Sequence, residues 1–109
     1  AERLLALRRP PSAIFASNDD MASAAVSVAH RRGLDVPRDL SVVGFDDTSA
    51  ATMVWPELTT IHQPVATMAD TAIDILLREI RRSSSPRTVV NHVLPHQLVR
   101  RSSVARGPG

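Results

Sequence analysis

Polar side chains directly follow two short apolar segments of this sequence. The segments are residues 13–17 (AIFAS) and 40–45 (LSVVGF), and the polar residues after them are Asn18, Asp19, Asp20, Asp46 and Asp47. The length and apolar content of both segments predict buried strands. Ligands of open α/β sheets bind beyond the carboxyl ends of the strands, where carboxylates and amides can hydrogen-bond hydroxyl groups and a carboxylate pair can hold a cation. These polar residues are therefore the first candidates for a binding site.

The elements that would position these residues alternate between strand and helix. Helices are expected over residues 2–9, 21–32 and 63–82, and strands over residues 13–17, 40–45, 58–61, 88–94 and 97–101. Loops are expected over residues 47–57 and 83–86, and the tail from Ser103 is expected to fray. This alternation predicts an α/β fold with a parallel sheet and helices on both faces. Gly33 suits the end of the second helix, and Gly44 indicates a close approach of backbone.

The composition excludes several classes of protein. The 109 residues are 43% hydrophobic, include no cysteine and contain no apolar run near the 18 residues of a membrane helix. The apolar part of residues 1–11 is too short for a signal peptide. The net charge is only +2, and the arginines are scattered as short pairs, which indicates solvated charge rather than a nucleic-acid surface. We expect a domain, or part of one, that works in the cytoplasm without contacting a membrane.

Four segments of the sequence carry a resemblance to a known family. They are SNDDMA (17–22), GLDVPRDLSVVGFDDT (33–48), PELTTIHQP (56–64) and LPHQLVRRSS (94–103). In this order and at these separations they resemble the lactose-repressor/galactose-repressor (LacI/GalR) family of bacterial transcription regulators. The resemblance extends over residues 11–103 and concerns the C-terminal part of the effector-binding core of that family.

The resemblance implies a two-lobed fold of the type I periplasmic-binding-protein kind, with the ligand between the lobes. Residues 1–62 and 93–102 would belong to the C-terminal lobe, residues 63–92 would be a segment of the N-terminal lobe, and residues 103–109 would be a tail. The chain would cross between lobes at Gln63–Pro64 and at His92–Pro95. The helix-turn-helix domain of the family has no counterpart in this chain.

The same resemblance singles out three ligand-binding residues. Asp46, Asn18 and Gln63 match effector-contact positions of the family and would bind a small effector, a sugar or a nucleoside-like molecule. Each has an alternative role, since Asp46 could form a turn, Asn18 could cap the second helix and Gln63 could serve the hinge. Asp47 and Asp19 are expected to be structural, and to cap a helix or bond loop backbone.

Two regions are candidates for the interface of a homodimer. They comprise part of the alanine-rich helix and the loop before the third strand, with the residues Met21, Ala25, Val28, Met53, Val54 and Trp55. Two copies of one surface could form an isologous contact. The alternative for the helix is burial within the domain, and the alternative for Trp55 is stacking on a sugar ring.

The sequence thus predicts the effector-sensing and dimer-forming part of a bacterial transcription regulator. Operator DNA would be bound only by domains that are not in this chain, and neither a catalytic residue nor a cofactor nor a metal site is expected. His92 and His96 flank Pro95 in extended chain and are not expected to share a metal. The alternatives are a periplasmic sugar-binding protein of the same fold and, more distantly, a phosphoacceptor or enzyme with an acidic Mg²⁺ pocket, which the absence of lysine argues against.

Overall fold

The computed structural model describes residues 1–82, 89 and 91–107, and within it the chain divides into two compact units. The first unit comprises Ala1–His62 with Gln97–Gly109, and the second comprises Gln63–His96. The first boundary falls where the sequence places a crossover. The second boundary falls four residues later than expected, because the strand that pairs antiparallel with residues 60–62 begins at Gln97.

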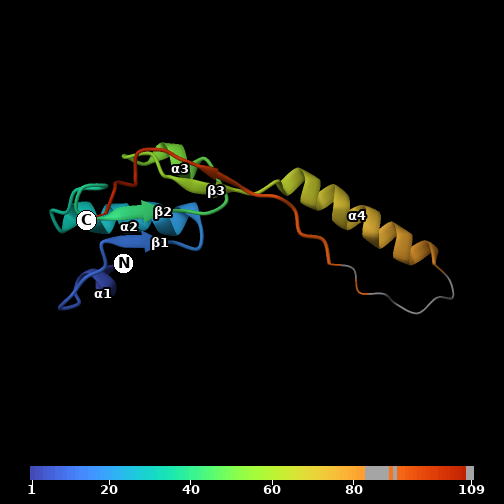
Figure 1. The fold of residues 1–109 in the computed structure, drawn as a ribbon, viewed down its shortest axis with the longest axis horizontal. Helices are drawn as coiled ribbons and strands as arrows, with labels where there is room; N and C mark the ends of the chain where they lie inside the picture. The colour runs from blue at the N-terminus through green and yellow to red at the C-terminus, as the bar shows by residue number, and fades with distance from the viewer. Residues whose placement is uncertain (83–88, 90, 108–109) are drawn as a thin grey trace. The chain divides into compact units, whose positions relative to one another are not determined.

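The strands of the first unit confirm the expected parallel sheet (Figure 1). Strand β1 (Ala13–Phe15) pairs in parallel with β2 (Ser41–Val43), and β3 (Thr60–His62) pairs antiparallel with β4 (Gln97–Val99). Two isolated parallel bridges, Val43↔Thr59 and Asp46↔His62, join the segment after β2 to the segment of β3. Strands β1, β2 and β3 therefore run in one direction, and their carboxyl ends lie at one edge.

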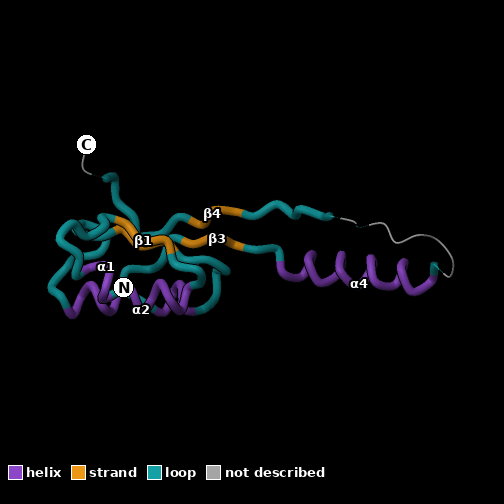
Figure 2. The backbone as a smooth tube through the Cα atoms, turned by 90° about the horizontal axis from the view of Figure 1, so that it is seen from below, coloured by secondary structure: helices purple, strands orange, loops and turns teal. Residues whose placement is uncertain are grey.

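Helix α2 (Asp19–Arg31) packs along one face of β1 and β2 (Figure 2). It begins two residues earlier than expected, because the Asn18 side chain caps it by accepting a hydrogen bond from the Met21 amide at 2.8 Å. It ends before Gly33, whose φ of +73° is a left-handed conformation that glycine adopts without strain. Both ends of the helix are thus specified by the residues that the sequence analysis marked.

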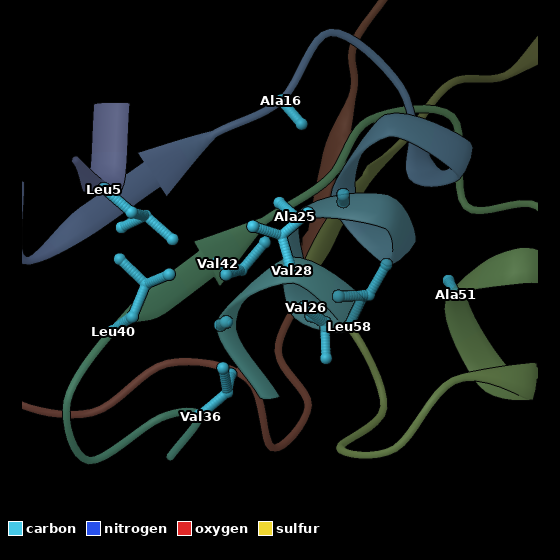
Figure 3. Close-up of a cluster of buried hydrophobic side chains, with 12 residues drawn as sticks. Leu5, Ala16, Ala25, Val26, Val28, Val36, Leu40, Val42, Ala51 and Leu58 are labelled. Atoms are coloured by element: carbon cyan, nitrogen blue, oxygen red, sulfur yellow. The ribbon is translucent and has the colours of Figure 1, made fainter. Parts of the chain in front are cut away.

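The core of the first unit lies between α2 and the strands (Figure 3). Its largest fully buried apolar side chains are Val26, Leu40, Val42 and Leu58. Alanines of α2 allow the helix to approach the strands closely. Burial of each large apolar side chain contributes roughly 1.5–3 kcal/mol to the stability of the folded state. This packing fixes the position of α2 relative to the carboxyl ends of the strands.

The two short helices of the first unit differ from the sequence prediction. Helix α1 (Glu2–Leu5) is shorter than the expected helix over residues 2–9. The region expected to be an irregular loop contains a helical turn, α3 (Ala50–Met53), which packs against α2 with Ser23 Oγ donating to the Ala50 carbonyl at 3.4 Å. A single helical turn is too short to give a periodic pattern in the sequence.

The prediction that the tail frays from Ser103 is wrong. Ser103 is completely buried, and its hydroxyl accepts a hydrogen bond from the Thr59 amide at 2.8 Å and donates to the Val42 carbonyl at 2.5 Å. The Val42 amide donates in turn to the Ser103 carbonyl at 2.9 Å. The segment after β4 therefore continues along the sheet and ties β2 to the segment before β3.

The second unit contains one long helix, α4 (Val65–Arg81), close to the expected helix over residues 63–82. No residue of α4 is buried in this chain, although its apolar residues form a stripe at helical spacing. Residues 89 and 91–94 are not in a strand, so the expected strand over 88–94 is not found in its described part. Residues 88 and 90 and the loop expected over 83–86 lie outside the described residues. None of the described helices is long and apolar enough to cross a membrane.

Candidate functional site

The three expected ligand-binding residues follow the carboxyl ends of three neighbouring strands. Asn18 follows β1, Asp46 follows β2, and Gln63 is the residue directly after β3. The Asp46 amide donates to the Ile61 carbonyl at 2.9 Å, and Asp46 forms a parallel bridge with His62. The segment after β2 is thereby held against the end of β3. All three residues are half-buried.

The side chain of Asn18 has a structural role that the sequence analysis raised as an alternative. Its Oδ1 accepts the hydrogen bond from the Met21 amide that caps α2. An asparagine side chain carries one acceptor oxygen and an amide group with two donors. Because the cap uses Oδ1, the amide Nδ2 is the group of Asn18 suited to donate to a ligand.

The backbone at Asp46 and Asp47 turns sharply. Both residues have positive φ, 102° at Asp46 and 57° at Asp47. For residues other than glycine, a backbone conformation with positive φ costs of order 1–3 kcal/mol of conformational free energy. Aspartate is among the residue types that tolerate this conformation best. Such conformations persist only where the surrounding structure holds them, and they cluster at functional sites.

Asp47 makes structural contacts, but with side chains rather than with a helix end or the loop backbone that the sequence analysis expected. Its carboxylate accepts a hydrogen bond from Arg101 Nη2 at 2.7 Å and lies 3.1 Å from His62 Nδ1. The hydrogen bond from Arg101 is the main reason that the pKa of Asp47 lies below its ordinary value, and the contact with His62 adds to it. Asp47 thus joins the turn after β2 to the end of β3 and to the segment after β4.

Arg101 is a residue of this network that sequence reasoning missed. Besides Asp47, it contacts the Leu58 carbonyl through Nη1 at 2.9 Å, and its amide donates to Thr59 Oγ1 at 3.0 Å. In the sequence Arg101 is one of several arginine pairs. Nothing in its neighbourhood distinguishes it from a solvated arginine, because its partners lie more than 40 positions away.

Asp19 is also structural, in line with the expectation for it. Its carboxylate is completely buried and accepts hydrogen bonds from Thr48 and Thr60. Across the described ranges, no group of three or more His, Cys, Asp or Glu side chains could hold a metal ion. The carboxylates of Asp19 and Asp47 are both engaged with protein donors.

The six candidates for a dimer interface differ in their exposure. Met53 and Trp55 are 84% and 77% exposed, and Met21 is 54% exposed. Val54 is half-buried and packs against the core, and Ala25 and Val28 belong to the core itself. The alternative of burial within the domain therefore describes Ala25 and Val28 in this chain. The exposed candidates are Met21, Met53 and Trp55.

Comparisons with known proteins agree with this architecture. A family model described as a periplasmic binding protein-like domain matches residues 1–104. The HTH-type transcriptional repressor PurR of Escherichia fergusonii is 39% identical over 108 residues, which make up 98% of this chain and 31% of that relative. The chain thus spans about a third of the length of the curated relatives that it matches.

Two solved structures are similar to the chain in fold and sequence. A complex of the transcriptional regulator CelR with cellobiose matches with a TM-score of 0.77 and 34% sequence identity. The match covers 84% of this chain and 28% of the CelR chain. A dimeric Lac repressor with a C-terminal deletion matches with a TM-score of 0.75 and 36% sequence identity. The match covers 86% of this chain and 34% of the repressor chain.

These matches define the class of protein: the chain belongs to the family of periplasmic binding protein-like domains. Within that class it is part of the effector-binding core of a LacI/GalR-type regulator, as the resemblance in its sequence predicts. Its relatives are transcriptional repressors rather than enzymes, in agreement with the expectation that it has no catalytic role. The matches favour this regulatory class over a periplasmic sugar-binding protein.

Proposed function

We propose that this chain senses a small effector for a dimeric bacterial transcription regulator of the cytoplasm. The observation that carries the proposal is the position of Asn18, Asp46 and Gln63 after the carboxyl ends of three parallel neighbouring strands. Polar groups at this edge are the usual means by which α/β domains bind small ligands. Operator DNA is bound by a helix-turn-helix domain outside this chain.

The three residues supply complementary hydrogen-bonding groups. The carboxylate of Asp46 accepts from two adjacent hydroxyl groups of the effector, and a charge-assisted hydrogen bond of this type is stronger than a neutral one. Asn18 donates through Nδ2, since its oxygen caps α2. Gln63 offers both a donor and an acceptor at the point where the chain leaves the first unit. A sugar or the ribose of a nucleoside presents hydroxyl pairs that fit these groups, and the related CelR structure holds cellobiose.

The two units of the chain belong to different lobes of the complete core. The first unit is the C-terminal lobe, and the second unit, with α4, is a segment of the N-terminal lobe. Support comes from the division of the chain at Gln63 and from the unburied apolar stripe of α4, which requires further protein to cover it. An effector that binds one arrangement of the lobes better than another shifts their equilibrium and thereby changes affinity for the operator.

The regulator forms a homodimer through the exposed apolar residues near α3. Met53 and Trp55 are large side chains that lie close together in the sequence and are left mostly exposed by this chain. Tryptophan is among the residue types most enriched at the energetic centres of interfaces. The related Lac repressor structure is dimeric.

A thermal-shift screen of the full-length protein tests the proposal. The panel comprises cellobiose, sucrose, galactose, adenosine and guanosine, with glycerol as a control for nonspecific stabilisation. At least one compound is expected to raise the melting temperature, because a ligand that binds only the folded state stabilises it. The same compound should change the affinity of the protein for DNA from its own promoter. Effector binding without any effect on DNA binding would contradict the regulatory role.

A further inference from the structure

The carboxyl group of Asp19 links three elements beneath the proposed site. It is completely buried at the first position of α2. Oδ2 accepts from the Thr48 amide at 2.7 Å and from Thr48 Oγ1 at 3.2 Å, and Oδ1 accepts from Thr60 Oγ1 at 2.6 Å. A buried carboxylate is tolerated only when it is hydrogen-bonded in this way. The contacts join the start of α2 to the turn after β2 and to β3.

The turn between Asp46 and Asp47 is held at both of its ends. At its start the Asp46 amide donates to the Ile61 carbonyl, and directly after it the Thr48 amide donates to Asp19. Two successive residues with positive φ need such restraints, since each is disfavoured by itself. The bond between Thr48 and Asp19 therefore restrains the backbone of the turn that carries Asp46, together with the contacts of Asp47 with Arg101 and His62.

Gly44 leaves the space that the Asp19 carboxylate occupies. A Cβ added at Gly44 would overlap Asp19 Oδ1 and would lie 3.3 Å from Asp19 Cγ and 3.4 Å from Ala22 Cβ. The backbone of Gly44 is not left-handed, so a glycine is not needed there for its conformational freedom. The sequence analysis indicated a close approach at Gly44, and in the structure the group that lies close to the Gly44 backbone is the Asp19 carboxylate.

We infer that Asp19 is a positioning residue for effector binding. Through Thr48 it fixes the turn that presents Asp46, and as the neighbour of Asn18 it fixes the start of α2 from which Asn18 projects. The inference rests on the proposed function of the site and adds a residue that contacts no ligand. Breaking the contacts of Asp19 should loosen the turn and weaken effector binding while the ligand-binding residues stay unchanged.

Thr60→Val and Thr60→Ser in the full-length protein form a matched pair for the test. Valine keeps the branched shape of threonine but removes the hydroxyl that donates to Asp19, whereas serine keeps the hydroxyl. Hydrogen exchange of the peptide that covers Thr48 is compared with that of peptides from α2, well below the unfolding temperature. Valine should accelerate exchange at Thr48 about tenfold more than exchange in α2, and serine should leave it close to wild type. A merely structural loss of stability would accelerate both regions together.

Affinity provides the second readout. Calorimetry with the panel compound that binds wild type best should show affinity reduced about tenfold in Thr60→Val and restored in Thr60→Ser. Gly44→Ala, which crowds Asp19, should resemble the valine variant, and Gly107→Ala, where an added Cβ meets no atom within 4 Å, should leave affinity unchanged.

Two results would overturn the inference: equal exchange at Thr48 in wild type and both Thr60 variants, or a loss of affinity that serine does not restore. If wild type binds no compound of the panel, the proposed function fails, while the exchange comparison still decides whether Asp19 holds the turn.

Discussion

At the scale of single residues, we assign different roles to the two aspartates that form the turn after β2. Asp47 points to Arg101 and His62 and is only 17% exposed at its side chain. Asp46 precedes it in the same turn, with a φ of 102°. One carboxylate therefore secures the turn to β3 and to the segment after β4, and the other is proposed to meet the effector.

The ion pair of Asp47 should make stability depend on pH in a predictable direction. The pKa of Asp47 is lowered in the folded state, so its contribution is complete above the ordinary aspartate pKa and is lost as pH falls through the lowered value. At pH 7, Asp47→Asn should reduce the free energy of unfolding by about 1–2 kcal/mol. Denaturant titrations at pH 7 and near pH 3 measure the difference. A difference that stays the same at both pH values would show that Arg101 does not stabilise the ionised form.

Neighbouring residues and a family resemblance predict different roles for Asp46 and Asp47, and the ligand-binding role of Asp46 stays a prediction. For Asn18 they predict ligand binding, with the helix cap that the structure shows as the alternative role. Sequence reasoning assigned a structural role to Asp19 but not its partners. Thr48, Thr60 and Arg101 contact these acids from positions 29 to 54 residues away. No local pattern of residue types encodes a contact of that separation.

At the scale of elements, the two long helices lie closer to their predicted bounds than the short helices and the segments that join the strands. The apolar residues and caps of α2 and α4 are local signals, so their existence and most of their bounds could be read from the sequence. Helix α3 and the ordered segment at Ser103 depend on tertiary contacts, which no periodicity records.

Ser103 is predicted to stabilise the sheet even though it lies near the end of the chain. Ser103→Ala would leave the Thr59 amide and the Val42 carbonyl without a buried partner, which should cost about 1–3 kcal/mol. Its neighbour Ser102 is exposed, so Ser102→Ala is a matched control that should change stability by less than about 0.5 kcal/mol. Thermal or denaturant unfolding of both variants provides the comparison. Equal effects would mean that the segment after β4 does not support the sheet.

At the scale of the whole molecule, the described residues leave large apolar side chains exposed. The apolar stripe of α4 and the exposed pair Met53 and Trp55 are the clearest of these. In the proposed regulator, the first is covered by the rest of the N-terminal lobe and the second by the partner copy.

The dimer proposal predicts that Trp55→Ala weakens association of the full-length protein. Loss of a buried tryptophan at an interface typically costs 2 kcal/mol or more, which corresponds to roughly a 30-fold increase in the dimer dissociation constant. Leu7→Ala, at another exposed apolar residue, serves as the control. Sedimentation velocity over a concentration series measures both variants. If Trp55→Ala instead weakens effector binding and leaves the dimer intact, Trp55 stacks on the ligand.

The central claim is that Asp46 binds the effector, and a single affinity comparison tests it most directly. Asp46→Gly removes the carboxylate while glycine accepts a φ of 102°, and Asp46→Asn keeps the shape but removes the charge. Calorimetry on the full-length protein, with the panel compound that binds wild type best, should show affinity reduced at least about tenfold in both variants, since hydrogen bonds to a charged group contribute about 1.5–3 kcal/mol. Unchanged affinity in a folded Asp46→Gly protein would contradict the account.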